Sequence, residues 1–334
     1  MSGRNASAEL SGWEFQFNAG IVIMLNYIRE ADSVRMEGTT QDIEVFFNDG
    51  RTVFAQAKSC SNPDDNSNAS RDWESAVTTL CEACQKSPVR ELIFVTNRHD
   101  PFCDKDSMRK FDHAYALVPF ANLPQACKDK ISKYCLRKGL SLPTDRFTVL
   151  DIEFSGDGFP RYETIKERVS SFLVEIDPLF SGWGSHVLQF WQQQFGMNAS
   201  QKDRNIRISK RRMIWPLIVR LCDRVDVDWI DDFDGSSIEE IEGSFGSIIE
   251  AHSERFDLVS KIMTSYETYK TLHRNKTERE TTAAFILEAQ QGLSDEFDLR
   301  DVDPEIATAV RKLTIEKILM ERRKIAKVKK AVGL

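Results

Sequence analysis

Asp42, Gln56 and Lys58 bring a carboxylate, a carboxamide and an ammonium group into one short stretch of this sequence. A hard divalent cation such as Mg²⁺ or Mn²⁺ prefers oxygen ligands, which Asp42, the Gln56 side chain and the Ala57 carbonyl can supply. Lys58 carries a point charge on a flexible stem, suited to steady a phosphate group or a nucleophilic water. These are the groups that metal-dependent hydrolysis of a phosphodiester requires.

A β-hairpin is the element that would bring these side chains together. The segments on either side of Asn48-Asp49-Gly50 alternate apolar and polar residues, which is the period of a half-buried strand. A hairpin closed by this three-residue loop pairs Val45 with Val53 and sets Asp42 directly opposite Gln56, with the lysine on the same face. A shift of one residue would turn polar side chains into the core, so the register is well determined. The same pattern also fits a plain surface hairpin with a polar, solvated face.

The segments around the hairpin predict the element order α-β-β-β-α-β. An amphipathic helix is expected over residues 11–28, and a short strand over 34–37 leads into the hairpin. The polar residues 59–70 predict an exposed, mobile loop after the hairpin. A second helix over 72–86 and a buried strand over 91–96 complete the order.

With Asp42 on the second strand and Gln56-Ala57-Lys58 on the third, the segment resembles the PD-(D/E)XK nuclease superfamily in the Q-x-K form of Mrr-type restriction endonucleases. It also resembles the double-stranded-DNA endonuclease domain of bacterial antiphage effectors of CBASS systems, and related nuclease subunits pair with HerA-like ATPases. The residues that carry this closer resemblance, within about the first 150, are Gly12-Trp13-Glu14-Phe15-Gln16, Glu37 with Asp42-Ile43, Gln56-Ala57-Lys58 and Phe94-Val95-Thr96-Asn97-Arg98.

The resemblance implies a restriction-endonuclease-like fold and a magnesium-dependent endonuclease that cleaves double-stranded DNA in antiphage defence. It gives the catalytic role to Asp42, Gln56 and Lys58. The oxygen ligands of the metal would be Asp42, Gln56, Ala57 and Glu37, with Glu14 and Gln16 on the preceding helix as auxiliary residues.

Two departures from the family pattern keep other functions open. Gln56 stands where the family usually has an acidic residue, so the site holds one less negative charge. The chain after Ser155 has a helical pattern, whereas a CBASS effector carries an α/β sensing domain there. A non-catalytic interaction subunit that keeps the nuclease fold is therefore an alternative, and an RNA-directed nuclease is another.

Composition and length indicate an ordinary soluble protein that can form two domains. Of the 334 residues, 41% are hydrophobic and 29% are charged, which is typical of globular chains. The sequence has no apolar run that could span a bilayer and no signal-peptide core, so we expect no contact with membranes. Seven cysteines without framework spacing suit a reducing cytoplasm, which is the expected location.

A net charge of −7 excludes a protein that is basic throughout, so DNA contact must depend on local patches. Phosphate contact requires only positive charge placed along the DNA backbone, although a solvated helix face has the same composition. The strongest basic cluster, countered only by Asp203, comprises Lys202, Arg204, Arg207, Lys210, Arg211 and Arg212.

A turn-rich break at 155–160 predicts two domains. Residues 1–155 would form the nuclease domain, and residues 160–334 a mostly α-helical domain. The expected fold class is therefore α+β or α/β, with a restriction-endonuclease-like αβββαβ core followed by helices. The apolar stripe from Ile238 to Met263 exceeds what a small module needs, so we expect the helical domain to form a homo-oligomer or to dock a defence-system subunit such as a HerA-like ATPase. Packing within the core of the helical domain is an alternative explanation of the same stripe.

Overall fold

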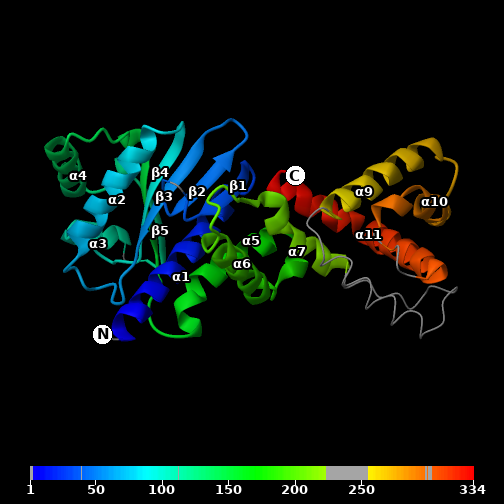
Figure 1. Ribbon diagram of the computed structural model, residues 1–334, viewed down its shortest axis with the longest axis horizontal. Helices are drawn as coiled ribbons and strands as arrows, with labels where there is room; N and C mark the ends of the chain where they lie inside the picture. Colours follow the sequence, from blue (N-terminus) through cyan, green and yellow to red (C-terminus); the bar gives the residue numbers. More distant parts are fainter. Residues whose placement is uncertain (1–2, 39, 112, 223–254, 298, 300–302) are drawn as a thin grey trace. The chain divides into compact units, whose positions relative to one another are not determined.

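The computed structural model describes all residues except 1–2, 39, 112, 223–254, 298 and 300–302, which are grey in Figure 1. The chain divides into two units, residues 1–210 with Gly333 and residues 211–332 with Leu334. This division lies far beyond the predicted break at 155–160.

The first unit extends past the predicted break because two helices that follow the break pack on the N-terminal helix. These helices are α5 (Glu163–Ile176) and α6 (Gly184–Ala199), and their partner is α1 (Gly3–Asn26). The apolar stripe of a helix indicates that it packs, but not on what. The break itself is a connection within one unit.

A seven-stranded mixed sheet with the order β5-β6-β4-β3-β2-β1-β7 is the framework of the first unit (Figure 1). Its strands are β1 (Ala31–Met36), β2 (Ile43–Phe47), β3 (Thr52–Lys58), β4 (Val89–Thr96), β5 (Tyr115–Pro119), β6 (Phe147–Ile152) and β7 (Ile208–Ser209). Strands β3, β4 and β6 are parallel, and the other neighbouring pairs are antiparallel. The predicted order α-β-β-β-α-β is confirmed, with α2 (Ala69–Cys84) between β3 and β4.

The predicted register of the hairpin is also confirmed. Val45 pairs with Val53, and the N–H of Phe47 donates to the carbonyl of Arg51 at 3.2 Å across the three-residue loop. Gly50 has a φ of +80°, the left-handed conformation that the last residue of such a loop adopts and that glycine tolerates best.

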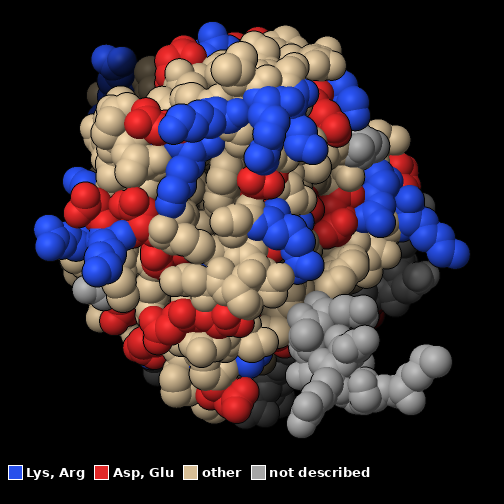
Figure 2. Space-filling view, turned by 90° about the vertical axis from the view of Figure 1, so that its left-hand side faces the viewer, with Lys and Arg blue, Asp and Glu red and all other residues tan. Residues whose placement is uncertain are grey.

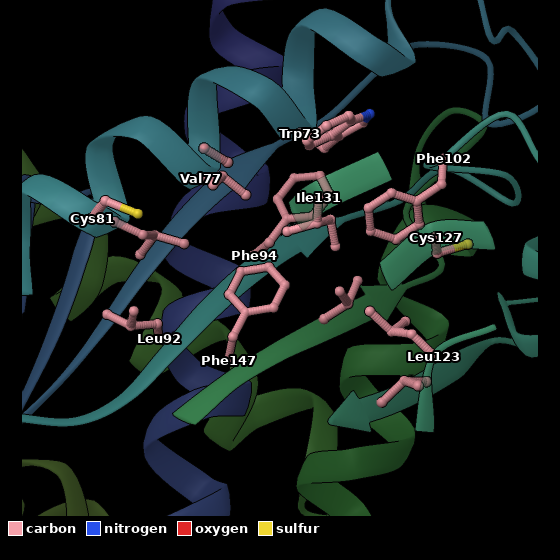
Figure 3. Packing of buried hydrophobic residues seen from close by; sticks show 14 of the residues in the cluster. Trp73, Val77, Cys81, Leu92, Phe94, Phe102, Leu123, Cys127, Ile131 and Phe147 are labelled. Carbon is pink, nitrogen blue, oxygen red and sulfur yellow. The ribbon is translucent and has the colours of Figure 1, made fainter. Parts of the chain in front are cut away.

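Helices cover both faces of the sheet. On one face, Trp73 and Val77 of α2 lie over Phe94 of β4 and Phe147 of β6, together with Ile131 of α4 (Gln125–Lys138) (Figure 3). On the other face, α1 packs against β1, β2 and β3. The strands of the hairpin are therefore buried almost throughout, whereas the sequence predicts a solvated face for them.

The remaining helices of the first unit are short. They are α3 (Lys105–Phe111) and the 3₁₀ helices η1 (Phe120–Asn122), η2 (Thr144–Arg146), η3 (Phe159–Tyr162) and η4 (Pro178–Phe180).

Every described secondary-structure element of the second unit is a helix, in agreement with the predicted helical C-terminal region. Its elements are α7 (Lys210–Cys222), which begins at the last residue of the first unit, α9 (Arg255–Leu272), α10 (Glu278–Gly292), η5 (Ser294–Glu296) and α11 (Pro304–Val332). The part of the predicted stripe before Arg255 lies outside the described residues. Among the described helices, none has both the length and the apolar character of a bilayer span.

Candidate active site

Asp42 and Gln56 meet at the end of the hairpin remote from its turn, as the predicted register requires. Gln56 Nε2 donates to Asp42 Oδ2 at 2.5 Å, and the backbone N–H of Ala57 donates to the same oxygen at 3.0 Å. The Gln56 oxygen accepts a hydrogen bond from Thr79 Oγ1 of α2 at 3.3 Å. In this structure Gln56 and Ala57 therefore act on the carboxylate as donors, whereas the sequence predicts them as oxygen ligands of a metal.

The Asp42 carboxyl group lies in a buried setting that disfavours its ionised form. Burial raises the pKa of Asp42 above its ordinary value, against the opposing effects of the Ala57 N–H, the Lys58 ammonium and the amides of Gln56 and Gln16. Four groups that favour the anion thus surround this carboxyl and still do not offset its burial. A cation beside Asp42 would supply the missing compensation.

Glu37 joins the site from the turn between β1 and β2. Its backbone has a φ of +47°, which is uncommon for a residue other than glycine, and its N–H donates to the Asp42 carbonyl at 2.7 Å. Burial and the Asp42 carboxylate raise the pKa of Glu37, and Arg204 and Lys58 oppose this shift. Two carboxyl groups and the Lys58 ammonium therefore share one electrostatic neighbourhood, which includes the Glu37 predicted as a metal ligand.

A buried carboxylate beneath this turn holds its backbone in place. Glu44, only 1% exposed, forms an ion pair with Arg35 of β1 and accepts the backbone N–H groups of Thr40 and Gln41 at 3.2 and 3.3 Å. A Cβ at position 38 would lie 2.4 Å from the Glu44 carboxyl carbon, so any residue other than Gly38 would displace this ion-paired carboxylate. The half-buried period predicted for this strand would put Glu44, a polar position between Ile43 and Val45, on the solvated face, and it gives no sign of this role. The only sequence signal for it is a glycine followed by polar residues within a turn.

Helix α1 contributes Gln16 to the site and directs Glu14 elsewhere. Glu14 forms an ion pair with Arg161 of η3 at 3.0 Å and accepts a hydrogen bond from Tyr162 at 3.2 Å. The Gln16 amide lies close enough to Asp42 to lower the pKa of that carboxyl group, and its buried Oε1 has no hydrogen-bond partner within the described part of the chain. Of the two predicted auxiliary residues, Gln16 is the one that the fold brings to Asp42.

The donor set of the site suits a hard cation that keeps part of its water shell. Nowhere in the described residues do three or more His, Cys, Asp and Glu side chains come together as a metal site. The site instead offers the carboxyl groups of Asp42 and Glu37 and the unpartnered amide oxygen of Gln16. Because Mg²⁺ is often bound by one or two carboxylates together with substrate phosphates, these residues fit it.

The loop after Lys58 is exposed over most of residues 61–68, as predicted. Side chains of the residues that follow β4 nevertheless form hydrogen bonds and ion pairs with this loop and with α2. The Arg98 guanidinium pairs with Asp72 of α2 at 2.7 Å and donates to the Asp65 carbonyl. The His99 ring bridges Asp64 Oδ1 at 2.8 Å and Glu153 Oε2 at 3.0 Å. A connection expected to be mobile is thus anchored to the sheet.

The His99 bridge makes this anchoring dependent on pH. Partial burial lowers the pKa of His99, but hydrogen bonds to Glu153 and Asp64 and their charges outweigh that effect, so the pKa is raised above its ordinary value of 6.5. Only the imidazolium can donate to both carboxylates. The stabilisation is therefore complete below pH 6.5 and is lost as the pH rises through the folded-state pKa.

We expect limited proteolysis to cut the loop several-fold faster at pH 8.5 than at pH 6, relative to an unstructured peptide. In His99→Gln the protease should cut the loop at the faster rate at both pH values. In His113→Gln, which changes an exposed histidine, cutting should depend on pH as it does in the parent. A loop with the same relative rate at both pH values would contradict the bridge.

The basic cluster predicted for DNA contact is divided by the fold. Lys210 is buried, and its Nζ donates to the Arg29 carbonyl at 3.1 Å, so its ammonium is withdrawn from the surface. The Arg207 guanidinium lies 3.5 Å above the ring of Phe46. Both side chains contribute to packing around β1 and β2.

The other members of the cluster lie on different units. Arg204 is exposed and donates to the Glu37 carbonyl at 2.9 Å, at the edge of the site, and Lys202 is exposed nearby in sequence. Arg211 and Arg212 belong to the second unit, where Arg211 pairs with Asp257 at 2.6 Å. Phosphate contact by these residues stays a prediction, and Arg204 is the member placed beside the site.

The face of the molecule on the side of α3 and α4 also carries mixed charge. Figure 2 shows bands of Lys and Arg there, interspersed with Asp and Glu. This view therefore shows no continuous basic surface, in keeping with the net charge of −7.

Comparison with known proteins adds little to this description. No protein-family model and no curated protein matches the sequence. Among solved structures, the chain is similar to the Cap4 SAVED/CARF-domain containing receptor of Moraxella osloensis, with a TM-score of 0.40 and 14% identity. The match covers 76% of this chain and 60% of the receptor. A likeness of this degree says nothing about function.

Proposed function

We propose that this chain is a metal-dependent endonuclease that cleaves double-stranded DNA, with a restriction-endonuclease-like core and a role in antiphage defence. The observation that supports catalysis is the meeting of Asp42, Glu37 and Lys58 where β2 begins and β3 ends. The defence role rests on the sequence resemblance alone. Assembly into a homo-oligomer or with a HerA-like ATPase stays a prediction of the sequence.

In this proposal the site has an acidic half and a basic half. Asp42, Glu37 and the Gln16 oxygen would hold Mg²⁺, which supplies Lewis-acid polarisation of the attacked phosphate. Gln56 orients the Asp42 carboxylate through the hydrogen bond to Oδ2. Lys58 places positive charge beside the carboxylates, where it stabilises the negative charge that develops on the phosphate.

One observation favours a second function, that of a non-catalytic subunit that keeps the nuclease fold as a scaffold. Gln56 replaces the usual acidic residue, and its amide donates to Asp42. In such a subunit this hydrogen bond would only close the open end of the hairpin, and Asp42 would need no cation.

Binding of Mn²⁺, measured by calorimetry on the intact chain, separates the two functions. An active site should bind Mn²⁺, and Asp42→Asn should weaken binding at least about tenfold, because the anionic ligand is lost. Affinity should rise with pH above the ordinary carboxyl range, since protons compete for Asp42 and Glu37, whose pKa values are raised. Asp49→Asn, at the exposed turn of the same hairpin, is the control. Binding that does not depend on Asp42 would favour the scaffold.

Substrate class is tested by comparing duplex DNA, single-stranded DNA and RNA of one sequence in Mg²⁺. The proposal is overturned if RNA is cleaved and duplex DNA is not, because the site then serves an RNA-directed nuclease.

A further inference from the structure

Lys58 is the last residue of β3, and its placement depends on what holds the chain just beyond it. In the parallel register of β3 and β4, Lys58 pairs with Thr96, the last residue of β4. Both strands end at this row, so backbone pairing between them stops beside the candidate active site. The next residues are Ser59 and Cys60 on one side and Asn97 on the other.

The side chain of Asn97 continues the pairing where the backbone ladder ends. Its Oδ1 accepts the N–H of Cys60 at 2.9 Å, and its Nδ2 donates to the carbonyl of Cys60 at 2.8 Å. The same Nδ2 donates to the carbonyl of Phe154, just after β6, at 2.9 Å. One carboxamide thus satisfies both backbone groups of Cys60 and links them to the segment that follows β6.

Burial and chemistry make asparagine specific at this position. Asn97 is 1% exposed and its hydrogen bond to the Phe154 carbonyl is buried, so water is poorly placed to replace its amide at that carbonyl, whereas Cys60 itself is only partly buried. Aspartate has the same shape but lacks both N–H donors, and alanine lacks donors and acceptor alike. Either change would leave the carbonyls of Cys60 and Phe154 without their partner.

The effect of this contact reaches Lys58 through two peptide units. Lys58 is only half-buried, and its charge acts on both Asp42 and Glu37, so its ammonium lies near both carboxyl groups. A long flexible side chain keeps such a position only if its backbone is held in one direction. Arg98 and His99 hydrogen-bond to the later part of the loop, at Asp65 and Asp64. Of these three residues, only Asn97 hydrogen-bonds to the backbone close to Lys58, at Cys60.

We propose that Asn97 is a positioning residue that extends the β3–β4 pairing past Lys58 and thereby aims the Lys58 ammonium at Asp42 and Glu37. That this placement of Lys58 matters for catalysis rests on the proposed nuclease function. That Asn97 determines the placement does not depend on that function.

The test compares Asn97→Ala and Asn97→Asp with Asn18→Ala in the full chain. Asn18 of α1 is also 1% exposed, and its amide donates to the Glu14 carbonyl and accepts from Gln192. Asn18→Ala therefore controls for the loss of a buried, hydrogen-bonded amide at a site away from Lys58. In the Asn97 variants we expect amide exchange at Cys60 to rise about tenfold or more and acylation of Lys58 by acetic anhydride to change severalfold, as measured by mass spectrometry. Asn18→Ala should change neither.

Cleavage is the second readout. The Asn97 variants should lose about ten- to a hundredfold in kcat with KM and Mn²⁺ affinity unchanged, since the acidic half is intact. The proposal is overturned if Asn18→Ala loses as much kcat as the Asn97 variants do. It is also overturned if both Asn97 variants keep the parental rates of amide exchange at Cys60 and of Lys58 acylation. If the parent chain cleaves no nucleic acid, the proposed function fails, and exchange and labelling alone decide whether Asn97 places Lys58.

Discussion

Replacing Lys58 with alanine is expected to lower the rate of plasmid cleavage by about a thousandfold at saturating Mg²⁺. The Lys58 ammonium acts on both Asp42 and Glu37, so the substitution removes positive charge from beside both carboxyl groups. Asp42→Asn should have an effect at least as large, because it keeps the shape of the side chain and removes the anionic ligand. Initial rates from nicked and linear products measure both.

Two surface variants control for unspecific loss of charge. Lys86→Ala removes an exposed lysine before β4, and Asp49→Asn removes an exposed carboxylate from the hairpin turn. Both should cleave at the parental rate. Parental cleavage by Lys58→Ala and Asp42→Asn would show that the active site lies elsewhere.

Replacing Arg35 with methionine is expected to destabilise the β1–β2 part of the sheet by about 3–5 kcal/mol, because it leaves the Glu44 carboxylate buried and unpaired. The two side chains are 9% and 1% exposed, and Glu44 also holds the turn that carries Glu37. Hydrogen exchange at the amides of β1 and β2 reports the loss locally, without the assumption that both units unfold together.

The double variant Arg35→Met with Glu44→Leu separates the burial of charge from the pair itself. Most of the stability should return, since a buried ion pair and a well-packed apolar pair differ little in net free energy. Cleavage should not return, because the turn has lost the acceptor of Thr40 and Gln41. As a control, Arg51→Ala breaks a half-exposed pair with Asp49, and amide exchange in β1 and β2 should stay at the parental rate. Full stability in Arg35→Met alone would contradict the role of the pair.

The sequence alone determined the hairpin and its register. The two-residue period of the strands and a three-residue turn that ends in glycine are local signals, and together they leave one pairing. Asp42 therefore faces Gln56 in the structure as predicted, and the ammonium two residues later acts on the same carboxyl group. The element order around the hairpin is equally local, since each helix and strand shows its own period.

Only the tertiary structure decided which neighbours complete the site. Glu44 is buried because Arg35 of β1 pairs with it, and Glu14 turns away because Arg161, far along the chain, captures it. Lys210 is buried among backbone carbonyls although its surroundings in sequence are basic. Charged residues have no period that reports their partners, so their contacts follow from packing between distant segments. The division of the chain lies at residue 210 and not at the predicted break for a similar reason. An apolar stripe shows that a helix is buried but does not show which surface covers it.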